Sequence, residues 1–209
     1  MPLRAVFLDI GETLVDETRM WGAWADALEV PALTLFALLG AAIARGEHHR
    51  SVFDHFSPGR LARARGRMRS VEPLVPGDLY PDAVPCLSAL RDRGLRVGIG
   101  GNQPAAIEAA LVAVGVPADV IGSSERWGVE KPAPEFFRRL VAETGVPAEE
   151  VLHVGDRLDN DVLPALREGL QAALIRRGPW GLLHAARTAA PVRVLESLME
   201  VPELVDQLR

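Results

Sequence analysis

Three short apolar segments, each followed at once by polar residues, constrain the fold of this chain more than any other feature. The segments lie at residues 4–8, 95–99 and 151–154. Asp9, Asn102 and Asp156 come directly or shortly after their ends. An apolar run of this length that stops at turn-forming residues predicts a buried β-strand. The sequence therefore predicts three strands that each deliver a polar side chain at the carboxyl end.

The segments between these strands have the spacing of helices. Helical patterns lie at residues 82–93, 104–114, 134–144 and 161–168, and shorter strand candidates at 120–122 and 172–175. Strand and helix thus alternate from residue 79 onward. This alternation predicts an α/β fold, a Rossmann-like three-layer core in which helices cover both faces of a parallel sheet.

Residues 16–78 do not follow this alternation. Helical spacing is the one pattern found there, in residues 21–28, 32–45, 48–55 and 58–69. We therefore expect a small all-α insertion at 16–78 in a core built from residues 1–15 and 79–209. A chain of 209 residues suits one compact domain with a modest insertion.

The charge balance limits the class of partner. The chain carries a net charge of −5 and has a pI near 5.6. A net negative charge argues against non-specific binding to nucleic acid. We expect a small-molecule substrate as partner, neither nucleic acid nor membrane, and a monomer or a homodimer.

The sequence predicts a cytoplasmic protein. The apolar stretch at residues 21–43 is interrupted by Asp26, Glu29 and Pro31, which predicts amphipathic helices and no membrane span. The first strand begins within a few residues of the start, so we expect no signal peptide. The single cysteine, Cys86, excludes an internal disulfide and fits a reducing cytosol. Its position in an apolar helix predicts a buried structural role and no role as nucleophile.

The polar residues at the strand ends form a candidate site. Ligands of open α/β sheets bind beyond the carboxyl ends of the strands. The residues expected to converge there are Asp9, Glu12, Thr13, Asn102, Lys131, Asp156 and Asp161. Carboxylates beside a lysine suit a hard cation with oxygen ligands and an anionic substrate. The alternative is that these acids cap helices and turns, which explains one acid alone better than the whole set.

Four segments around these residues resemble the sequence motifs of the haloacid dehalogenase superfamily. Residues 6–14 resemble the first motif, a strand followed by Asp-x-Asp-x-Thr, and residues 97–102 resemble the second, a strand that ends in Ser or Thr before Asn. Residues 128–137, which contain Lys131, are very similar to the third motif. Residues 153–161 are very similar to the fourth, Gly-Asp-x-x-x-x-Asp. The resemblance covers nearly the whole predicted core.

The resemblance implies a role for each site residue. Asp9 would attack the substrate and form an aspartyl intermediate, and Lys131 would screen the negative charge between them. The implied cofactor is Mg²⁺, held by Asp9, Asp156, Asp161 and the carbonyl of Gly11. The implied substrate-binding residues are Gly101, Asn102 and Thr13. A carboxylate is a competent nucleophile only where the negative charge of its target is neutralised, as a metal ion and a lysine would do.

The sequence departs from the family pattern at two glycines. Gly11 stands where the family has the second aspartate of the first motif, and Gly101 stands where it has a hydroxyl residue. In the family that aspartate protonates the leaving group and then activates water, and loss of such a general acid–base costs roughly 10²–10⁴ in rate. Its metal contact comes from a backbone carbonyl, which Gly11 keeps. Glu12 is a candidate catalytic replacement; the alternatives are a Glu12 that faces solvent or braces the loop.

The insertion resembles the helical C1-type cap that many family members carry between the first and second motifs. Its basic residues form two clusters, one at Arg45, His48, His49 and Arg50 and one at Arg60, Arg63, Arg65, Arg67 and Arg69. Either cluster could contact an anionic substrate, although solvated helix faces explain most such runs. Outside the insertion, Trp127 and Trp180 flank the core loops and could line the entrance.

Three functions fit these residues. The leading one is a Mg²⁺-dependent phosphatase of a small phosphorylated metabolite, slow because Gly11 replaces an acid. The second is a haloacid dehalogenase, in which halide leaves without a proton and no metal is needed. The third is a catalytically weak protein that binds a phosphorylated ligand or a partner. The two glycines favour this last function. The intact residues Asp9, Lys131, Asp156 and Asp161 argue against it.

Overall fold

The computed structural model describes residues 2–188 and 192–208. The chain forms two compact units. The larger unit contains the residues up to 16 and from 74 onward, and the smaller unit is Glu17–Pro73. Each unit has its own buried side chains and is described by itself.

Residues 74–78 belong to the larger unit, although the sequence places them in the insertion. Asp78 gives a physical reason for this difference. Its carboxylate is buried and accepts a hydrogen bond from the amide of Val75, and its carbonyl accepts one from the amide of Asp16. The segment that returns to the core is thereby tied to the segment that leaves it.

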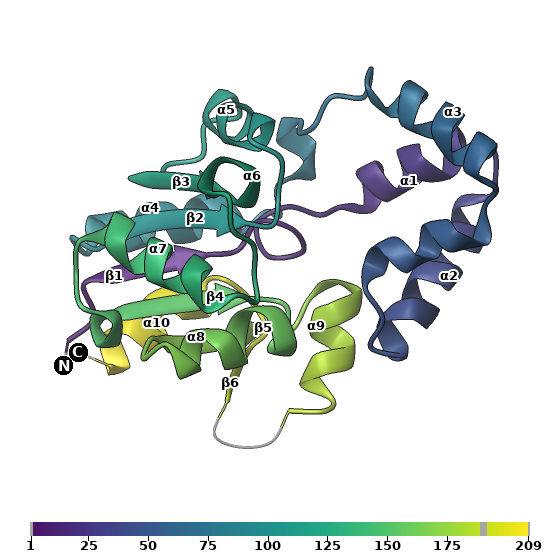
Figure 1. The fold of residues 1–209 in the computed structure, drawn as a ribbon. Coiled ribbons are helices and arrows are strands. Elements are labelled where there is room, and N and C mark those ends of the chain that lie inside the picture. The colour runs from purple at the N-terminus through teal and green to yellow at the C-terminus, as the bar shows by residue number, and fades with distance from the viewer. Residues whose placement is uncertain (1, 189–191, 209) are drawn as a thin grey trace. The chain divides into compact units, whose positions relative to one another are not determined.

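The larger unit is built on a sheet of six parallel strands (Figure 1). In chain order they are β1 (Ala5–Leu8), β2 (Arg96–Gly101), β3 (Val120–Ser123), β4 (Val151–Gly155), β5 (Gln171–Ile175) and β6 (Arg193–Leu195). Their order in the sheet is β3-β2-β1-β4-β5-β6, with every neighbouring pair parallel. The predicted α/β fold is confirmed. Because β1 lies between β2 and β4, the three polar strand ends are neighbours.

The sequence of β1 explains its central place. All four residues are buried, as expected for a parallel strand covered on both faces. Successive side chains point to opposite faces, so that Val6 and Leu8 join one hydrophobic cluster and Ala5 and Phe7 join another. Phe7 lies opposite Gly98 of β2, where an added Cβ would overlap its ring. A glycine at this position therefore lets a large aromatic side chain fill the second cluster.

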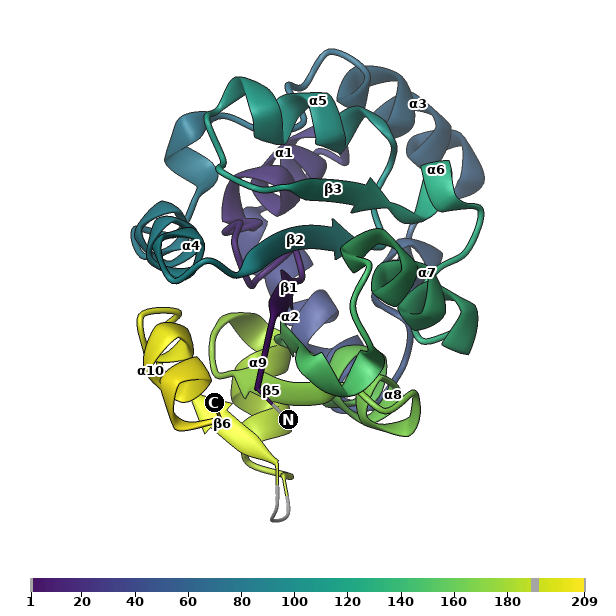
Figure 2. The same ribbon diagram turned by 90° about the vertical axis from the view of Figure 1, so that its left-hand side faces the viewer.

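Helices cover both faces of the sheet and complete three layers (Figure 2). They are α4 (Ala83–Asp92), α5 (Ala106–Ala113), α6 (Ser124–Trp127), α7 (Pro134–Thr144), α8 (Leu163–Arg167), α9 (Gly178–Ala185) and α10 (Glu200–Gln207). Figure 2 shows α4 and α10 on one side of the strands and α7 and α8 on the other. The clusters agree, since Leu87 and Leu204 belong to one, and Phe136 and Ala165 to the other.

Short or irregular elements account for what the sequence does not predict. β6 has three residues, too few to show an alternating pattern, and α9 begins with Gly178 and Pro179, which are typical of turns. The predicted helix at 161–168 is preceded by a π-helical turn, Leu158–Val162, before α8 begins. That turn carries Asp161, so the irregularity lies at the candidate site.

The smaller unit is all-helical, as predicted for the insertion. Its elements are α1 (Thr18–Ala27), α2 (Ala32–Ala44), a 3₁₀ helix (His49–His55) and α3 (Pro58–Met68). The Trp24 and Phe53 rings pack with centroids 4.7 Å apart, next to buried side chains such as Val52. No single helix among the described residues has the length and apolar composition to cross a membrane, although α1 and α2, bent by 115° at their junction, meet that test as a pair.

Cys86 is fully buried in α4, which confirms its predicted structural position. Burial raises the pKa of its thiol to about 12. A thiol with such a pKa carries almost no thiolate at neutral pH. Cys86 is therefore a poor nucleophile.

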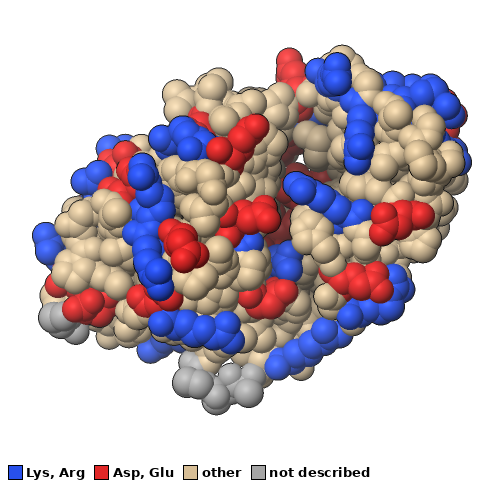
Figure 3. Space-filling model, in the orientation of Figure 1, with Lys and Arg blue, Asp and Glu red and all other residues tan. Residues whose placement is uncertain are grey.

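The exposed charges are of both signs and closely mixed on the face shown in Figure 3. Many of them form ion pairs at the surface of the larger unit. Examples are Arg138 with Glu168 at 2.8 Å and Arg139 with Glu143 at 2.6 Å. Exposed pairs of this kind each contribute about 0–1 kcal/mol to stability. The charges with larger consequences are the buried ones.

Candidate active site

The candidate active site lies at the adjoining ends of β1, β2 and β4. Asp9 follows β1, and Asp156 follows β4. Asp161 comes from the π-helical turn after β4, and Lys131 precedes α7. The structure brings these four residues together, although they span more than 150 positions of the chain.

Lys131 is at the centre of the cluster. Its ammonium group donates hydrogen bonds to Oδ1 of Asp9 at 2.6 Å and to Oδ1 of Asp161 at 2.5 Å. Its side chain is 1% exposed, and its Nζ lies 5.7 Å from the centre of the Phe136 ring. Burial acts to lower the pKa of Lys131, but the two carboxylates outweigh it and raise that pKa. The lysine is therefore charged at neutral pH.

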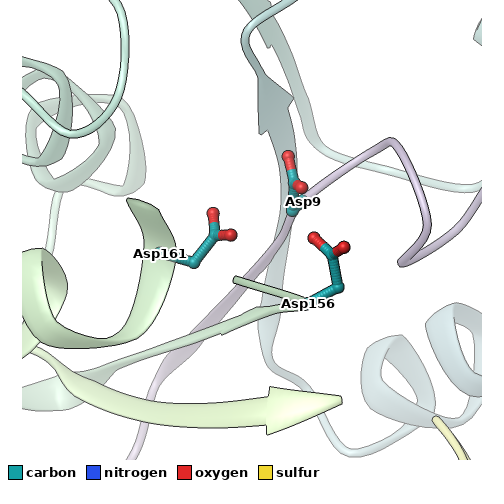
Figure 4. Close-up of side chains that lie close together, drawn as sticks. All are labelled: Asp9, Asp156 and Asp161. Carbon is teal, nitrogen blue, oxygen red and sulfur yellow. The ribbon is translucent and has the colours of Figure 1, made fainter. Parts of the chain in front are cut away.

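Three aspartates, shown in Figure 4, converge at the ends of β1 and β4. Asp9, Asp156 and Asp161 are all buried, and one oxygen of each lies within 4.8 Å of the others. Oδ2 of Asp156 is buried and has no hydrogen-bond partner among the described residues. Three carboxylates and one ammonium leave two negative charges uncompensated when all are ionised. A divalent cation with oxygen ligands fits this donor set.

The three aspartates differ in how their charge is stabilised. Burial raises the pKa of Asp9, although Lys131 acts in the opposite direction. Burial, followed by the charge of Asp161, raises the pKa of Asp156 well above its ordinary value. Burial also opposes ionisation of Asp161, but Lys131 and His153 together outweigh it and lower the pKa of that carboxyl. Asp156 is thus the carboxylate that most lacks a cation.

Asn102 holds the backbone of Lys131. Its Nδ2 donates to the Lys131 carbonyl at 2.8 Å, and its Oδ1 accepts from the Lys131 amide at 2.7 Å. Both polar atoms of the side chain are therefore engaged with the protein. A contact between Asn102 and the substrate stays a prediction, and the second N–H of Nδ2 and the backbone remain for such a contact.

Gly101 lies against Asp9. A Cβ added at Gly101 would come within 2.7 Å of Oδ1 of Asp9 and 3.4 Å of Cβ of Ile10. Serine or threonine would therefore force the Asp9 carboxylate to move. The observed orientation of the Asp9 carboxylate therefore requires a residue without a side chain at position 101.

Glu12 is buried in the loop that follows β1. It is 6% exposed, which contradicts one of the alternatives for this residue, that it faces solvent. Its Oε2 accepts a hydrogen bond from the Tyr80 hydroxyl at 2.7 Å. It also packs so closely on Gly178 that a Cβ there would overlap the carboxylate. Glu12 has a φ of +52°, a conformation that costs most residues about 1 kcal/mol or more.

Thr13 and Arg177 tie this loop to the rest of the larger unit. Thr13 is fully buried, its carbonyl accepts from Arg177 at 3.1 Å, and its hydroxyl has no partner among the described residues. Arg177 also pairs with Asp82 and lies 4.3 Å above the Tyr80 ring. Burial opposes ionisation of Asp82, but Arg177 and Ser197 outweigh it and lower its pKa to about 2. A contact between Thr13 and the substrate stays a prediction.

A family model described as haloacid dehalogenase-like hydrolase matches residues 3–169. The match includes the whole smaller unit, most of the larger unit, and Asp9, Lys131, Asp156 and Asp161. The chain belongs to the haloacid dehalogenase-like hydrolase family. The superfamily resemblance seen in the sequence motifs is thereby confirmed.

Several curated proteins resemble parts of this haloacid dehalogenase-like chain. Glyceraldehyde 3-phosphate phosphatase of Methanopyrus kandleri is 38% identical over 104 residues, which are 48% of this chain and 45% of the relative. Phosphoglycolate phosphatase of Rhodospirillum rubrum is 33% identical over 129 residues, which are 60% of this chain and 52% of the relative. The chain thus spans about half the length of the curated relatives it matches.

Solved structures of haloacid dehalogenase-like proteins share the fold over the whole chain. The putative hydrolase YfnB of Bacillus subtilis, solved with bound magnesium, has a TM-score of 0.76 at 17% identity, with 99% of this chain and 100% of that chain covered. A phosphatase of Thermococcus onnurineus has a TM-score of 0.63 at 22% identity, with 97% and 98% covered. At these identities the likeness concerns the fold alone.

Sequence reasoning missed three residues of this haloacid dehalogenase-like site: His153, Tyr80 and Arg177. His153 contacts Asp161 from within β4, and its signal is a polar residue in an otherwise apolar strand. Tyr80 and Arg177 contact the loop after β1 from distant parts of the chain. Nothing in their local sequence marks either as a partner of that loop.

Two tryptophans considered for the site entrance pack against the core instead. The Trp127 ring covers Gly122 of β3 and lies 5.1 Å from the Phe136 ring, centroid to centroid. Trp180 is 6% exposed and lies beneath the guanidinium of Arg157 at 5.5 Å. Their large side chains serve packing, which explains why both are mostly buried.

Part of the second basic cluster stabilises the smaller unit itself. Arg60 donates to the carbonyls of Leu28 and Glu29, and Arg67 donates to the carbonyl of Ala27. These carbonyls lie at and beyond the end of α1, where the helix leaves acceptors unpaired and positive charge is favourable. Arg60 and Arg67 therefore have a structural function, and the role of this cluster in substrate binding stays a prediction.

Proposed function

We propose that this chain is a Mg²⁺-dependent phosphatase that cleaves a small phosphorylated metabolite through an aspartyl-phosphate on Asp9. The observation that carries the proposal is the buried cluster in which Lys131 joins Asp9 to Asp161 beside the uncompensated Asp156. The names of the relatives, which act on glyceraldehyde 3-phosphate and phosphoglycolate, support a phosphate monoester as substrate.

In this proposal Asp9 is the nucleophile. Lys131 binds Oδ1 of Asp9 and so fixes the direction of the carboxylate. Its charge is positioned to reduce repulsion between that carboxylate and an incoming phosphoryl group. Both side chains are buried, and the low polarity around them strengthens this electrostatic effect.

The residues that would hold Mg²⁺ are Asp9, Asp156 and Asp161, together with the carbonyl of Gly11. When bound, the ion would supply positive charge for the transferred phosphoryl oxygens. Oδ2 of Asp156, which has no hydrogen-bond partner within residues 2–188 and 192–208, fits a direct ligand best. Gly101, Asn102 and Thr13 are proposed to border the phosphoryl group.

Proton transfer is the weak part of the proposed reaction. Gly11 offers no acid for the leaving group and no base for the water that attacks the aspartyl-phosphate. Glu12 supplies the nearest carboxylate on the same loop, but Tyr80 and Gly178 hold it. We therefore propose a slow phosphatase, in which loop bracing is the first role of Glu12 and acid–base catalysis the alternative.

The smaller unit is proposed to act as a C1-type cap that selects the substrate. The proposed location is the cytoplasm, where small phosphorylated metabolites occur. Arg45 and the neighbouring residues 48–50 are candidate contacts for the anionic substrate. A substitution Arg50→Ala, which leaves the larger unit unchanged, should raise KM if this contact forms.

One screen tests the proposal directly. Phosphate monoesters, including glyceraldehyde 3-phosphate and phosphoglycolate, are incubated with the protein in the presence of Mg²⁺ or a chelator. We expect phosphate release that requires Mg²⁺, and calorimetry should show that Asp156→Ala and Asp161→Ala both weaken Mg²⁺ binding. Absence of Mg²⁺ binding by the unsubstituted protein, with or without a phosphate mimic, would contradict the site.

Haloacid dehalogenation is the second candidate function, because Gly11 removes an acid that a halide leaving group does not need. It makes the opposite prediction for the metal. Halide release from a 2-haloacid in the presence of a chelator, without phosphate release in the first screen, would establish it. Binding of phosphorylated metabolites with no turnover of either substrate class would instead favour a binding protein.

A further inference from the structure

His153 is a polar residue in the middle of the apolar strand β4. It is fully buried and lies between Phe7 of β1 and Ala172 of β5 in the sheet. The Phe137 ring meets the imidazole edge-on, with centroids 5.6 Å apart. A leucine or valine would suit this environment better by hydrophobic burial alone.

The imidazole makes one hydrogen bond to the described residues. Its Nε2 lies 3.3 Å from Oδ1 of Asp161. Because the ionised carboxylate can only accept, Nε2 must carry the proton that is shared. The other nitrogen, Nδ1, is buried without a hydrogen-bond partner among the described residues. A buried polar atom without a hydrogen bond lowers the stability of the fold. The chain therefore retains a histidine that is unfavourable for folding.

The one bond that His153 makes acts on the carboxylate that holds Lys131. Oδ1 of Asp161 accepts from both His153 and Lys131, and Oδ2 accepts from the amide of Arg157 at 3.1 Å. A carboxylate has about four acceptor positions, so these three donors fix its orientation and leave about one position open. Gly155, two residues after His153 in β4, lets the carboxylate lie against the strand, because a Cβ there would overlap Asp161.

We propose that His153 is a positioning residue: its Nε2–H orients Asp161, which in turn keeps Lys131 beside Asp9. The inference rests on the proposed function for its catalytic consequence. The hydrogen-bonded chain runs from His153 to Asp161 to Lys131 to Asp9, and all of its side chains are at least 89% buried. Because each of these side chains contacts the next and burial strengthens their charge interactions, a change at His153 is expected to reach the nucleophile.

The test compares three variants. His153→Leu removes the N–H donor and fills similar space. His153→Gln retains an N–H at a similar distance from the backbone. Phe137→Leu is the matched control, because it removes the ring packed on the imidazole and leaves the hydrogen bond in place. Each variant is measured for thermal stability, Mg²⁺ affinity by calorimetry and steady-state kinetics, and crystal structures of the two His153 variants locate Asp161 and Lys131.

We expect His153→Leu to melt within a few degrees of the unsubstituted protein, or above it. Its Mg²⁺ affinity and its kcat should fall by about 10–100-fold, as for other residues that orient a metal ligand, with KM changed far less. His153→Gln should recover most of the loss. Phe137→Leu should lower the melting temperature and leave kcat nearly unchanged.

Two results would overturn the inference. One is a His153→Leu protein with normal metal affinity and turnover, and an Asp161 carboxylate that has not rotated. The other is a His153→Gln protein no better than His153→Leu, because packing and not the N–H would then matter. If the unsubstituted protein releases no phosphate at all, the proposed function fails, yet metal titration and the crystal structures still decide the role of His153.

Discussion

The two sides of Asp9 differ in how they use polar side chains. On the β4 side, Lys131, Asp161 and His153 are buried and bound to one another. On the β2 side and in the loop after β1, Gly101 and Gly11 carry no side chain, and Glu12 is engaged by Tyr80. The charged residues of the family motifs are thus retained on the β4 side, whereas Gly11 replaces the aspartate that would transfer protons and Gly101 replaces a hydroxyl residue.

This difference has a physical cause. The groups of the β4 side stabilise one another's charge, so the loss of any one leaves another buried and unpaired. A side chain at position 11 that transfers protons would have no such obligatory partner, and its loss would cost rate without costing stability. The two sides should therefore respond differently to substitution.

Asp9 lies between the two sides, and its substitution should give the largest loss of turnover. Asp9→Asn removes the nucleophile and should reduce turnover by about 10⁴-fold or more. The amide oxygen can still accept from Lys131, so the melting temperature should change little. Phosphate release and thermal unfolding measure the two effects, with Asp92→Asn at an exposed position as the matched control. An Asp9→Asn protein with most of its activity would rule out the aspartyl mechanism.

Lys131→Met tests whether the β4 side is a network of mutually dependent charges. The substitution leaves Asp9 and Asp161 buried without their cation, which should destabilise the larger unit by about 3–5 kcal/mol. Urea unfolding with a chelator present measures this loss. Adding Asp161→Asn should restore part of the stability, because it removes one of the unpaired charges. Additive effects of the two substitutions would show that the pair is not coupled.

Gly11→Asp tests the other side. Without a base, the aspartyl-phosphate should accumulate, so p-nitrophenyl phosphate should give a burst followed by slow turnover. The burst should appear because p-nitrophenolate leaves without a proton. Restoring the acid should raise the steady rate by about 10–100-fold, part of what a general acid–base supplies, with little change in stability.

Glu12→Gln is the control for Gly11→Asp. It keeps a hydrogen-bond acceptor for Tyr80 and removes the ability to transfer a proton. A small effect on turnover is expected if Glu12 braces the loop. A protein without a burst, in which Glu12→Gln lowers turnover about a hundredfold, would instead identify Glu12 as the acid–base.

The same contrast explains how much the sequence alone could predict. Asp9 and Asp156 each follow an apolar strand directly, so local pattern and sheet geometry suffice to bring them together. The long regular helices, such as Pro134–Thr144, were predictable from their spacing for the same reason.

The partners of Glu12 were not predictable, because they come from positions 80 and 178, far away in the sequence. Its own φ of +52° places a glutamate where the local rules favour glycine or asparagine. The direction of its side chain depends on those tertiary contacts. The two hydrogen bonds between the Asn102 side chain and the Lys131 backbone were not predictable either, because they form only where two loops meet.

Gly178→Ala gives the smallest expected effect and decides whether Glu12 is fixed in its loop. Gly178 has a φ of +61°, and an added Cβ would overlap the Glu12 carboxylate. Gly145 has a similar φ of +66° with nothing within 4 Å of an added Cβ, so Gly145→Ala measures the backbone strain alone, about 1 kcal/mol. We expect Gly178→Ala to cost about 1–2 kcal/mol more in urea unfolding. Glu12→Gly should remove that excess in the Gly178→Ala protein. Equal losses at the two glycines would mean that Glu12 does not pack on Gly178 in solution, and its carboxylate would then be free to take part in proton transfer.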